Sequence, residues 1–123
     1  MKPEHVEYRL VEGDDDLDAV AMVGGKQVGY ANGLKTGDSL FLADIHIELP
    51  FQRQKIGSGL LRFVLNAADG ACMREVWGKV TADDLDVNPH LLEWYQRHGF
   101  EIIEPDSDMA TGPVALKKVV RRR

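Results

Sequence analysis

The stretch from Leu49 to Leu61 combines glycines, basic and amide side chains, and the start of an amphipathic pattern. An alternating run of apolar and polar residues precedes it, so a bend between a strand and a helix is expected here. Glycines let the backbone approach a ligand, and the first N–H groups of a helix lack an internal partner. Because the helix dipole is positive at the same point, the stretch predicts a site for an anion such as a pyrophosphate.

The segment Gln52–Gly59, which we call the glycine loop, resembles the acetyl-CoA loop of the GCN5-related N-acetyltransferase (GNAT) superfamily. The signature of that loop is Gln/Arg-x-x-Gly-x-Gly/Ala at a junction between strand and helix. Two registers fit. From Gln54, the signature is met literally by Gly57 and Gly59. From Gln52, a longer stretch aligns, although Lys55 stands where the first glycine is usual, and we prefer this register.

A second match lies near the end of the chain. In the family, a late helix opens with Asn and carries a Tyr seven residues on, before a Gly-Phe pair. Asn88, Tyr95 and Gly99-Phe100 stand at these spacings. The resemblance covers the chain from about Ser39 to Val120.

The resemblance implies acetyl-CoA as co-substrate and direct acyl transfer to an amine, without a covalent enzyme intermediate. Tyr95 becomes the candidate general acid for the CoA thiolate, although periodicity alone would make it a packed aromatic residue. The backbone of Ile47 and Leu49 would hold the pantetheine arm, the glycine loop the pyrophosphate, and Asn88 a further contact. The implied donor-binding residues are Ile47, Leu49, Gln52, Arg53, Gln54, Lys55, Ile56, Gly57, Ser58, Gly59, Asn88 and Tyr95.

The general base has several candidates. One group, after an expected strand, is Asp83, Asp84 and Asp86; another, alternating on one face of the central strand, is Asp44, His46 and Glu48. An ordered water could serve instead. The second group, Asp44, His46 and Glu48, could instead face solvent on the same side of the sheet as the polar side chains of the first strand. A metal site is not expected, because three ligands on one strand seldom converge.

Three other residues whose side chains can carry chemistry receive structural interpretations. Cys72 falls on the apolar stripe of the first helix, so we expect a small core residue rather than a nucleophile. His90 and His98 are expected at surface or packing positions of the late helix.

Hydrophobic periodicity predicts an α/β fold (α+β), with a mixed, mostly antiparallel sheet and two main helices, similar to the GNAT fold. Only Glu12 to Leu17 is available where the family usually places two helices between its first and second strands. Their absence predicts an open substrate site, or one completed by a second subunit. The expected strands are His5–Val11, Asp18–Val23, Lys26–Asn32, Ser39–Leu49, Glu75–Thr81, Phe100–Glu104 and Pro113–Val120, and the expected helices are Gly57–Ala71 and Asn88–His98.

Composition limits the classes of function. The 123 residues are expected to form one domain, 1–123, and the single cysteine excludes an internal disulfide. A net charge of −5 disfavours nucleic acid, and the short basic end with Lys117-Lys118 and Arg121–Arg123 is interpreted as solvated. No apolar run long enough to cross a membrane and no signal peptide is seen, so a cytoplasmic protein is expected.

The sequence therefore predicts a small acetyl-CoA-dependent N-acetyltransferase. The acceptor could be a protein amine, a polyamine or a small metabolite. The alternative is a catalytically idle member of the family that binds acyl-CoA as an interaction or sensing module. Homodimerisation through the exposed sheet face would be compatible with either function.

Overall fold

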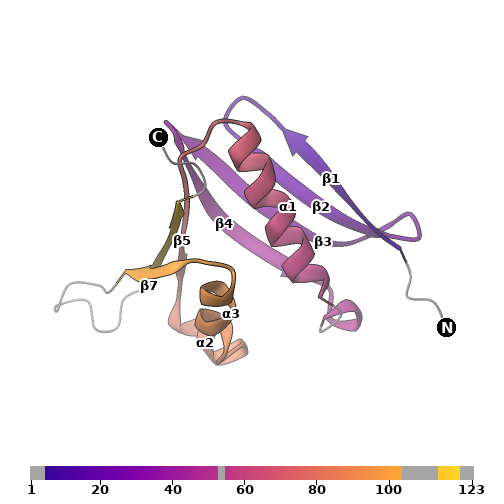
Figure 1. Ribbon diagram of the computed structural model, residues 1–123. Coiled ribbons are helices and arrows are strands. Elements are labelled where there is room, and N and C mark those ends of the chain that lie inside the picture. The colour runs from indigo at the N-terminus through magenta and orange to yellow at the C-terminus, as the bar shows by residue number, and fades with distance from the viewer. Residues whose placement is uncertain (1–4, 53–54, 104–113, 120–123) are drawn as a thin grey trace.

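The computed structural model describes residues 5–52, 55–103 and 114–119. They form a seven-stranded sheet of order β1-β2-β3-β4-β5-β7-β6 with helices packed against it (Figure 1). The strands are β1 (Val6–Glu12), β2 (Leu17–Val23), β3 (Lys26–Thr36), β4 (Ser39–Ile47), β5 (Glu75–Val80), β6 (Glu101–Ile103) and β7 (Val114–Val119). The helices are α1 (Ile56–Gly70), α2 (Ala82–Val87) and α3 (Leu91–Arg97), with a short 3₁₀ turn, η1 (Leu49–Phe51).

The first four strands form the expected antiparallel meander, each pairing with the next. Gly24 and Gly25 have φ angles of 59° and 81°, which side chains rarely allow, so this pair makes the tight turn between β2 and β3. As expected, no helix lies between β1 and β2: Gly13 to Asp16 form only a turn. One face of the meander is therefore left uncovered by the described helices.

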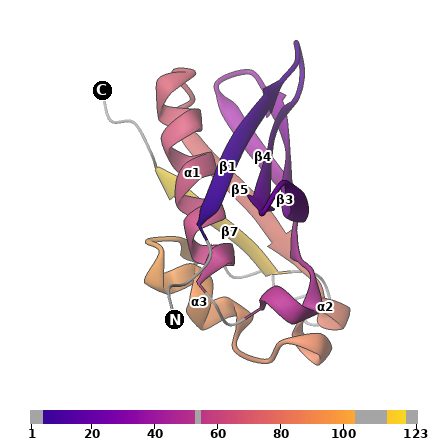
Figure 2. The same ribbon diagram turned by 90° about the vertical axis from the view of Figure 1, so that its right-hand side faces the viewer.

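Helix α1 covers the other face (Figure 2). Its apolar stripe, which includes Leu60, Leu61 and Val64, is fully buried against inward-facing residues of the sheet such as Leu17 and Leu40. Each side chain of this size stabilises the fold by about 1.5–3 kcal/mol when it leaves water. The helix thus sets the position of the glycine loop at its N-terminus. No helix in the described part of the chain has the length and apolar character needed to cross a membrane.

Strands β4 and β5 are parallel and pair only briefly. Their register runs from Ser39↔Glu75 to Phe41↔Trp77. Beyond Phe41, β4 carries a bulge: Asn32 pairs with Asp44 but Gly33 with Leu42, so Ala43 is the extra residue. A bulge bends its strand and increases the local twist. The two strands separate after this point, and α2 and α3 gather at the open end, beside the N-terminus of α1 (Figures 1 and 2).

The segment after β5 differs from the sequence prediction in two respects. Helix α2 was not expected; it begins with a capping box in which Thr81 and Asp84 exchange hydrogen bonds between side chain and backbone. The late helix was expected to open at Asn88, but α3 begins at Leu91. Asn88 instead ends α2, and its side chain accepts a hydrogen bond of 3.2 Å from the His90 backbone N–H.

The prediction that Cys72 is a core residue was wrong. The helix ends at Gly70, and Cys72 lies in the following turn with an exposed side chain and a φ of 65°. The apolar stripe was extrapolated one turn too far, and Met73, whose side chain is buried, returns the chain to the core.

Candidate functional site

The backbone at the end of β4 faces the gap left by β5. The N–H of Glu48 donates a hydrogen bond of 2.8 Å to the carbonyl of Val28 on β3. Because backbone groups alternate in direction along an antiparallel strand, those of Ile47 point away from β3, toward the separated β5. The side-chain amide of Gln52 donates to the Ile47 carbonyl at 2.9 Å, so the glycine loop is tied to this edge.

The glycine loop turns into α1 at Lys55. This residue is the N-cap of the helix and has a φ of 64°, in the left-handed region that favours glycine. Lys55 is the position where the preferred register places the family's first glycine, and its conformation supports that register. Leu49 lies in η1, while Arg53 and Gln54, both expected to bind the donor, lie outside the described residues.

The two glycines of α1 have different surroundings. A Cβ at Gly57 would meet only ordinary contacts, with Ile47 at 3.6 Å and Trp94 at 3.8 Å. A Cβ at Gly59 would collide with the hydroxyl of Tyr8. Gly59 therefore makes room for a packed side chain, while the backbone at Gly57, which follows Ile56, remains approachable from outside.

Ser58, in the first turn of α1, connects this helix to α3. Its hydroxyl accepts a hydrogen bond of 3.1 Å from the indole N–H of Trp94 and lies 3.1 Å from Nε2 of His98. Burial, followed by the nearby charges of Arg62, Arg97 and Lys118, lowers the pKa of His98. A neutral imidazole can accept the serine proton at Nε2, so Ser58 can satisfy both partners. Its hydroxyl thus orients α3 and the neighbouring Tyr95.

Tyr95 is buried on α3, with its ring packed edge-on against Trp94 and Phe100 at centroid distances of 4.9 and 5.3 Å. It lines a small cavity with Leu42 and Gly78, at the place where β4 and β5 separate. Burial, then the carboxylates of Asp84 and Asp44, raise the pKa of Tyr95 to about 12. The phenol is therefore a stable hydrogen-bond donor at the inner end of the gap.

The interrupted β4–β5 pairing and the turn that leads into the main helix both lie within a segment that a family model matches. The model of the acetyltransferase (GNAT) domain matches residues 15–102. This chain belongs to the GNAT acetyltransferase family. The resemblance described from the sequence began at about Ser39, whereas the family model begins at residue 15. The matched domain therefore includes β2 and β3 as well.

Solved structures of GNAT proteins share the fold at low sequence identity. PaiA N-acetyltransferase from Thermoplasma acidophilum, in complex with coenzyme A, is 16% identical with a TM-score of 0.71, and the match covers 85% of this chain and 61% of that one. Ribosomal-protein-S18-alanine N-acetyltransferase from Escherichia coli is 20% identical with a TM-score of 0.75, and the match covers 91% of this chain and 74% of that one. IAA acetyltransferase from Bacillus cereus is 17% identical with a TM-score of 0.76, and the match covers 94% of this chain and 99% of that one. The search of curated proteins found no match. The expected co-substrate, acetyl-CoA, is the acyl donor of the GNAT family, and the first of these structures contains coenzyme A.

The candidate bases of this GNAT domain fall into two groups. On β4, Asp44 accepts a hydrogen bond of 3.1 Å from Tyr30, whose ring lies 5.6 Å from that of His46. Glu48 differs from both: its Oε2 is buried and has no hydrogen-bond partner among the described residues. A buried carboxylate oxygen without a partner is costly, so it marks a position where a ligand or water is expected.

On α2, Asp84 is committed to the capping box, and Asp86 is exposed. Asp83 also belongs to α2, although its side chain is outside what the structure describes. The charges of Asp44 on β4 and Asp84 on α2 both act on Tyr95 and raise its pKa. Sequence analysis missed Tyr30 and Trp94 as partners of site residues. Their aromatic character was the only signal, since the contacts depend on how strands and helices meet in space.

Asn88 is exposed at the end of α2, and its side-chain oxygen accepts the hydrogen bond from the backbone N–H of His90. As for metals, no cluster of three or more His, Cys, Asp or Glu side chains with suitable placement occurs within residues 5–52, 55–103 and 114–119.

Proposed function

We propose that this protein is an N-acetyltransferase that transfers an acetyl group from acetyl-CoA directly to an amine acceptor. The proposal is carried by one observation: three groups meet where β4 and β5 cease to pair. The first turn of α1 packs against Ile47 through Gly57, and against α3 through Ser58, while Tyr95 of α3 lines the cavity between the two strands. Acetyl-CoA, when bound, supplies an activated thioester and a thiolate leaving group. The described residues fit such a donor, because they combine a strand edge at Ile47 that does not pair with β5, a helix N-terminus and a buried proton donor.

The donor-binding role rests on backbone groups more than on side chains. The N–H groups of Ile56, Gly57 and Ser58 belong to the first turn of α1 and have no partner within the helix. Together with the helix dipole they favour a pyrophosphate there, and the exposed Lys55 adds positive charge. The Ile47 backbone would pair with the amide groups of the pantetheine arm once the Gln52 amide is displaced. We also propose contacts with the acyl donor for Arg53, Gln54, Leu49 and Asn88.

Tyr95 acts as a hydrogen-bond donor to the leaving sulfur. A thiol has an ordinary pKa of about 8.5 and is therefore a stronger acid than a phenol with a pKa of about 12. Complete proton transfer from Tyr95 is uphill, whereas a hydrogen bond that strengthens as charge develops on sulfur lowers the barrier. Such a donor typically contributes about 10²–10³-fold to the rate.

Glu48 is the base that we propose for the acceptor amine. Asp44 and Asp84 already accept hydrogen bonds from protein donors, whereas Oε2 of Glu48 does not. The amine would approach from the face of the sheet that the described helices leave uncovered. It would give its proton to Glu48 and attack the acetyl carbon as the C–S bond breaks and the thiolate leaves. The negative side chains of Asp44 and Glu48 favour an acceptor that carries further positive charge, such as a polyamine or a lysine peptide.

Titration calorimetry of the full chain with acetyl-CoA and CoA, followed by a thiol-release assay over a panel of amines and lysine peptides, tests this function. Donor binding with release of CoA is expected. Tyr95→Phe and Glu48→Gln should each lower turnover without weakening donor binding, and Asp86→Asn, an exposed carboxylate on α2, serves as the matched control. Binding without release for any acceptor would instead support an acyl-CoA-binding interaction or sensing module. The absence of binding would refute both functions.

A further inference from the structure

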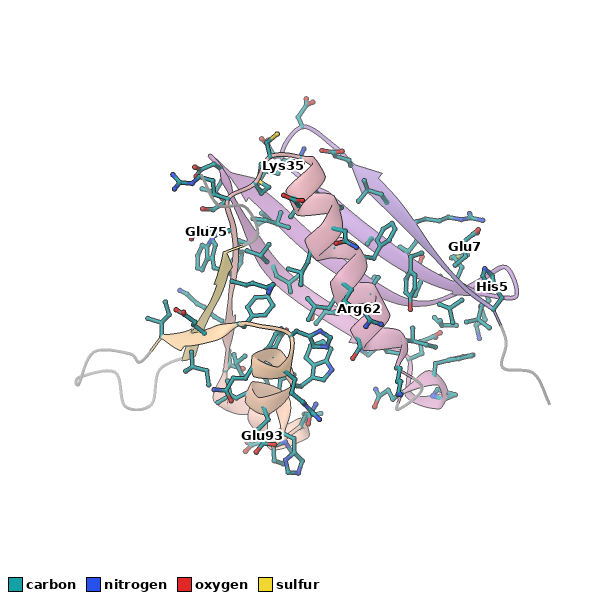
Figure 3. All side chains as sticks on the ribbon, in the orientation of Figure 1. His5, Glu7, Lys35, Arg62, Glu75 and Glu93 are labelled. Atoms are coloured by element: carbon teal, nitrogen blue, oxygen red, sulfur yellow. The ribbon has the colours of Figure 1, made fainter. Side chains whose placement is uncertain are left out.

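Three basic side chains, each from a different element, carry charges that act on His98. Arg62 follows Ser58 by one turn of α1 and so lies on the same side of that helix, which faces α3. Figure 3 shows it on the N-terminal half of α1. Arg97 precedes His98 at the end of α3, and the ammonium group of Lys118 on β7 lies against Gly99. We call Arg62, Arg97 and Lys118 the basic cluster.

No ion pair among the described residues joins the basic cluster to an acidic side chain. Among residues 5–52, 55–103 and 114–119, the ion pairs involve Arg9, Lys35, Arg74 and His90, and none of them involves the basic cluster. This is unusual in a chain with a net charge of −5. After burial, the charges of all three cations lower the pKa of His98. The geometry agrees, because Arg62 lies one turn from Ser58, which touches His98, and Lys118 lies against Gly99, the residue after His98. Like charges held together in this way repel one another unless an anion joins them.

The cluster is also next to the proposed donor site. His98 touches Ser58, whose backbone N–H belongs to the first turn of α1 where the pyrophosphate is proposed to bind. One helical turn, about 5.4 Å, separates Ser58 from Arg62 along the helix axis. A second anionic group of a ligand whose pyrophosphate binds at Ser58 would therefore lie within reach of the basic cluster.

We propose that Arg62, Arg97 and Lys118 form a subsite for the 3′-phosphate on the ribose of CoA. This inference rests on the proposed donor-binding function and adds to it the recognition of the nucleotide end. A phosphate monoester carries close to two negative charges at neutral pH, and the guanidinium groups can bind its oxygens through charge-assisted hydrogen bonds. The subsite would make the protein prefer CoA to the same molecule without its 3′-phosphate.

Calorimetric titration of the full chain with CoA and with 3′-dephospho-CoA tests this subsite. We expect CoA to bind about tenfold more tightly, since charge-assisted hydrogen bonds are the stronger kind and the site is exposed. The double variant Arg62→Gln/Lys118→Gln should bind CoA only as well as dephospho-CoA, with affinity for dephospho-CoA unchanged. Arg74→Gln removes an arginine whose partner is Asp38, at the other end of α1, and should retain the preference.

A second readout follows the imidazole itself. In NMR titrations, CoA should raise the pKa of His98 more than dephospho-CoA does, because the phosphate neutralises the cations that lower it. Equal binding of the two ligands by the unmodified protein, or equal weakening of both in the double variant, would overturn the subsite while leaving donor binding intact. Failure of the folded protein to bind either ligand would overturn the donor site as well.

Discussion

The ring of Tyr8 lies directly against the Cα of Gly59, and its hydroxyl donates a hydrogen bond of 3.3 Å to the carbonyl of Ile56. The first strand of the sheet is thereby packed on the first turns of α1. Gly59 is one of the two glycines that meet the acyl-donor signature literally from Gln54, yet its surroundings are those of a packing contact. At Gly57, by contrast, an added Cβ would make only ordinary van der Waals contacts.

The two glycines should therefore respond differently to the same substitution. Gly59→Ala is expected to lower the free energy of unfolding by about 1–3 kcal/mol, because the added methyl group overlaps Tyr8. Gly57→Ala should keep or slightly raise stability, since alanine favours helix, but should weaken acetyl-CoA binding if the donor approaches this backbone. Urea unfolding and calorimetry measure the two effects.

A double variant provides the control for this prediction. In a Tyr8→Leu background the collision is relieved, so the cost of Gly59→Ala should fall well below its cost in the unmodified protein. An equal cost in both backgrounds would show that Tyr8 is not the reason for glycine at position 59.

Lys55 offers a test of backbone strain in the glycine loop. Its φ of 64° is unfavourable for a residue with a Cβ. Lys55→Gly and Lys55→Ala remove the same charge, but only glycine relieves the strain. We therefore expect the glycine variant to be more stable than the alanine variant by about 1 kcal/mol in urea unfolding. Equal stability, or a more stable alanine variant, would contradict the left-handed conformation of Lys55.

Local patterns account for the parts of the fold that sequence analysis predicted. The meander follows from alternating strands and the Gly24-Gly25 turn, and α1 follows from its apolar stripe. Helix α2 was missed because its six residues are too short for a hydrophobic period; the pairing of Thr81 with Asp84 three residues later was the available signal.

The candidate site was predicted less completely than the fold. The glycine loop and Tyr95 could be found by spacing alone, since each lies on one continuous segment. The bulge at Ala43, the contact of Ser58 with Trp94 and the basic cluster depend on how separate elements meet. Periodicity carries no information on such contacts, so they emerge only from the packed structure.

The pH dependence of turnover should report the raised pKa of Tyr95. With a pKa of about 12, this phenol stays protonated throughout pH 6–10. We expect kcat/KM to rise with pH as the acceptor amine loses its proton, without an alkaline fall below pH 10. Tyr95→Phe should lower kcat by about 10²-fold with an unchanged KM for acetyl-CoA and a profile of the same shape. A fall below pH 10 that disappears in Tyr95→Phe would show that Tyr95 ionises there.

His98 should make the stability of the protein depend on pH. Its pKa is lowered in the folded state by burial and by the basic cluster, so the unfolded chain binds a proton more readily. The stability contributed by neutral His98 is fully present above the unfolded pKa, about 6.5, and is lost as the pH falls from there toward the folded pKa. Thermal unfolding at pH 7.5 and pH 5 measures this loss.

His98→Gln should reduce that pH dependence, because glutamine can still approach the Ser58 hydroxyl but does not titrate. His90→Gln, on the exposed start of α3, is the matched control and should lose stability toward pH 5 as the unmodified protein does. Arg62→Gln should also make the loss smaller, because removing one of the cations that face His98 raises the folded pKa toward that of the unfolded chain. If His98→Gln and His90→Gln lost stability equally between pH 7.5 and pH 5, the folded environment of His98 would not favour its neutral form.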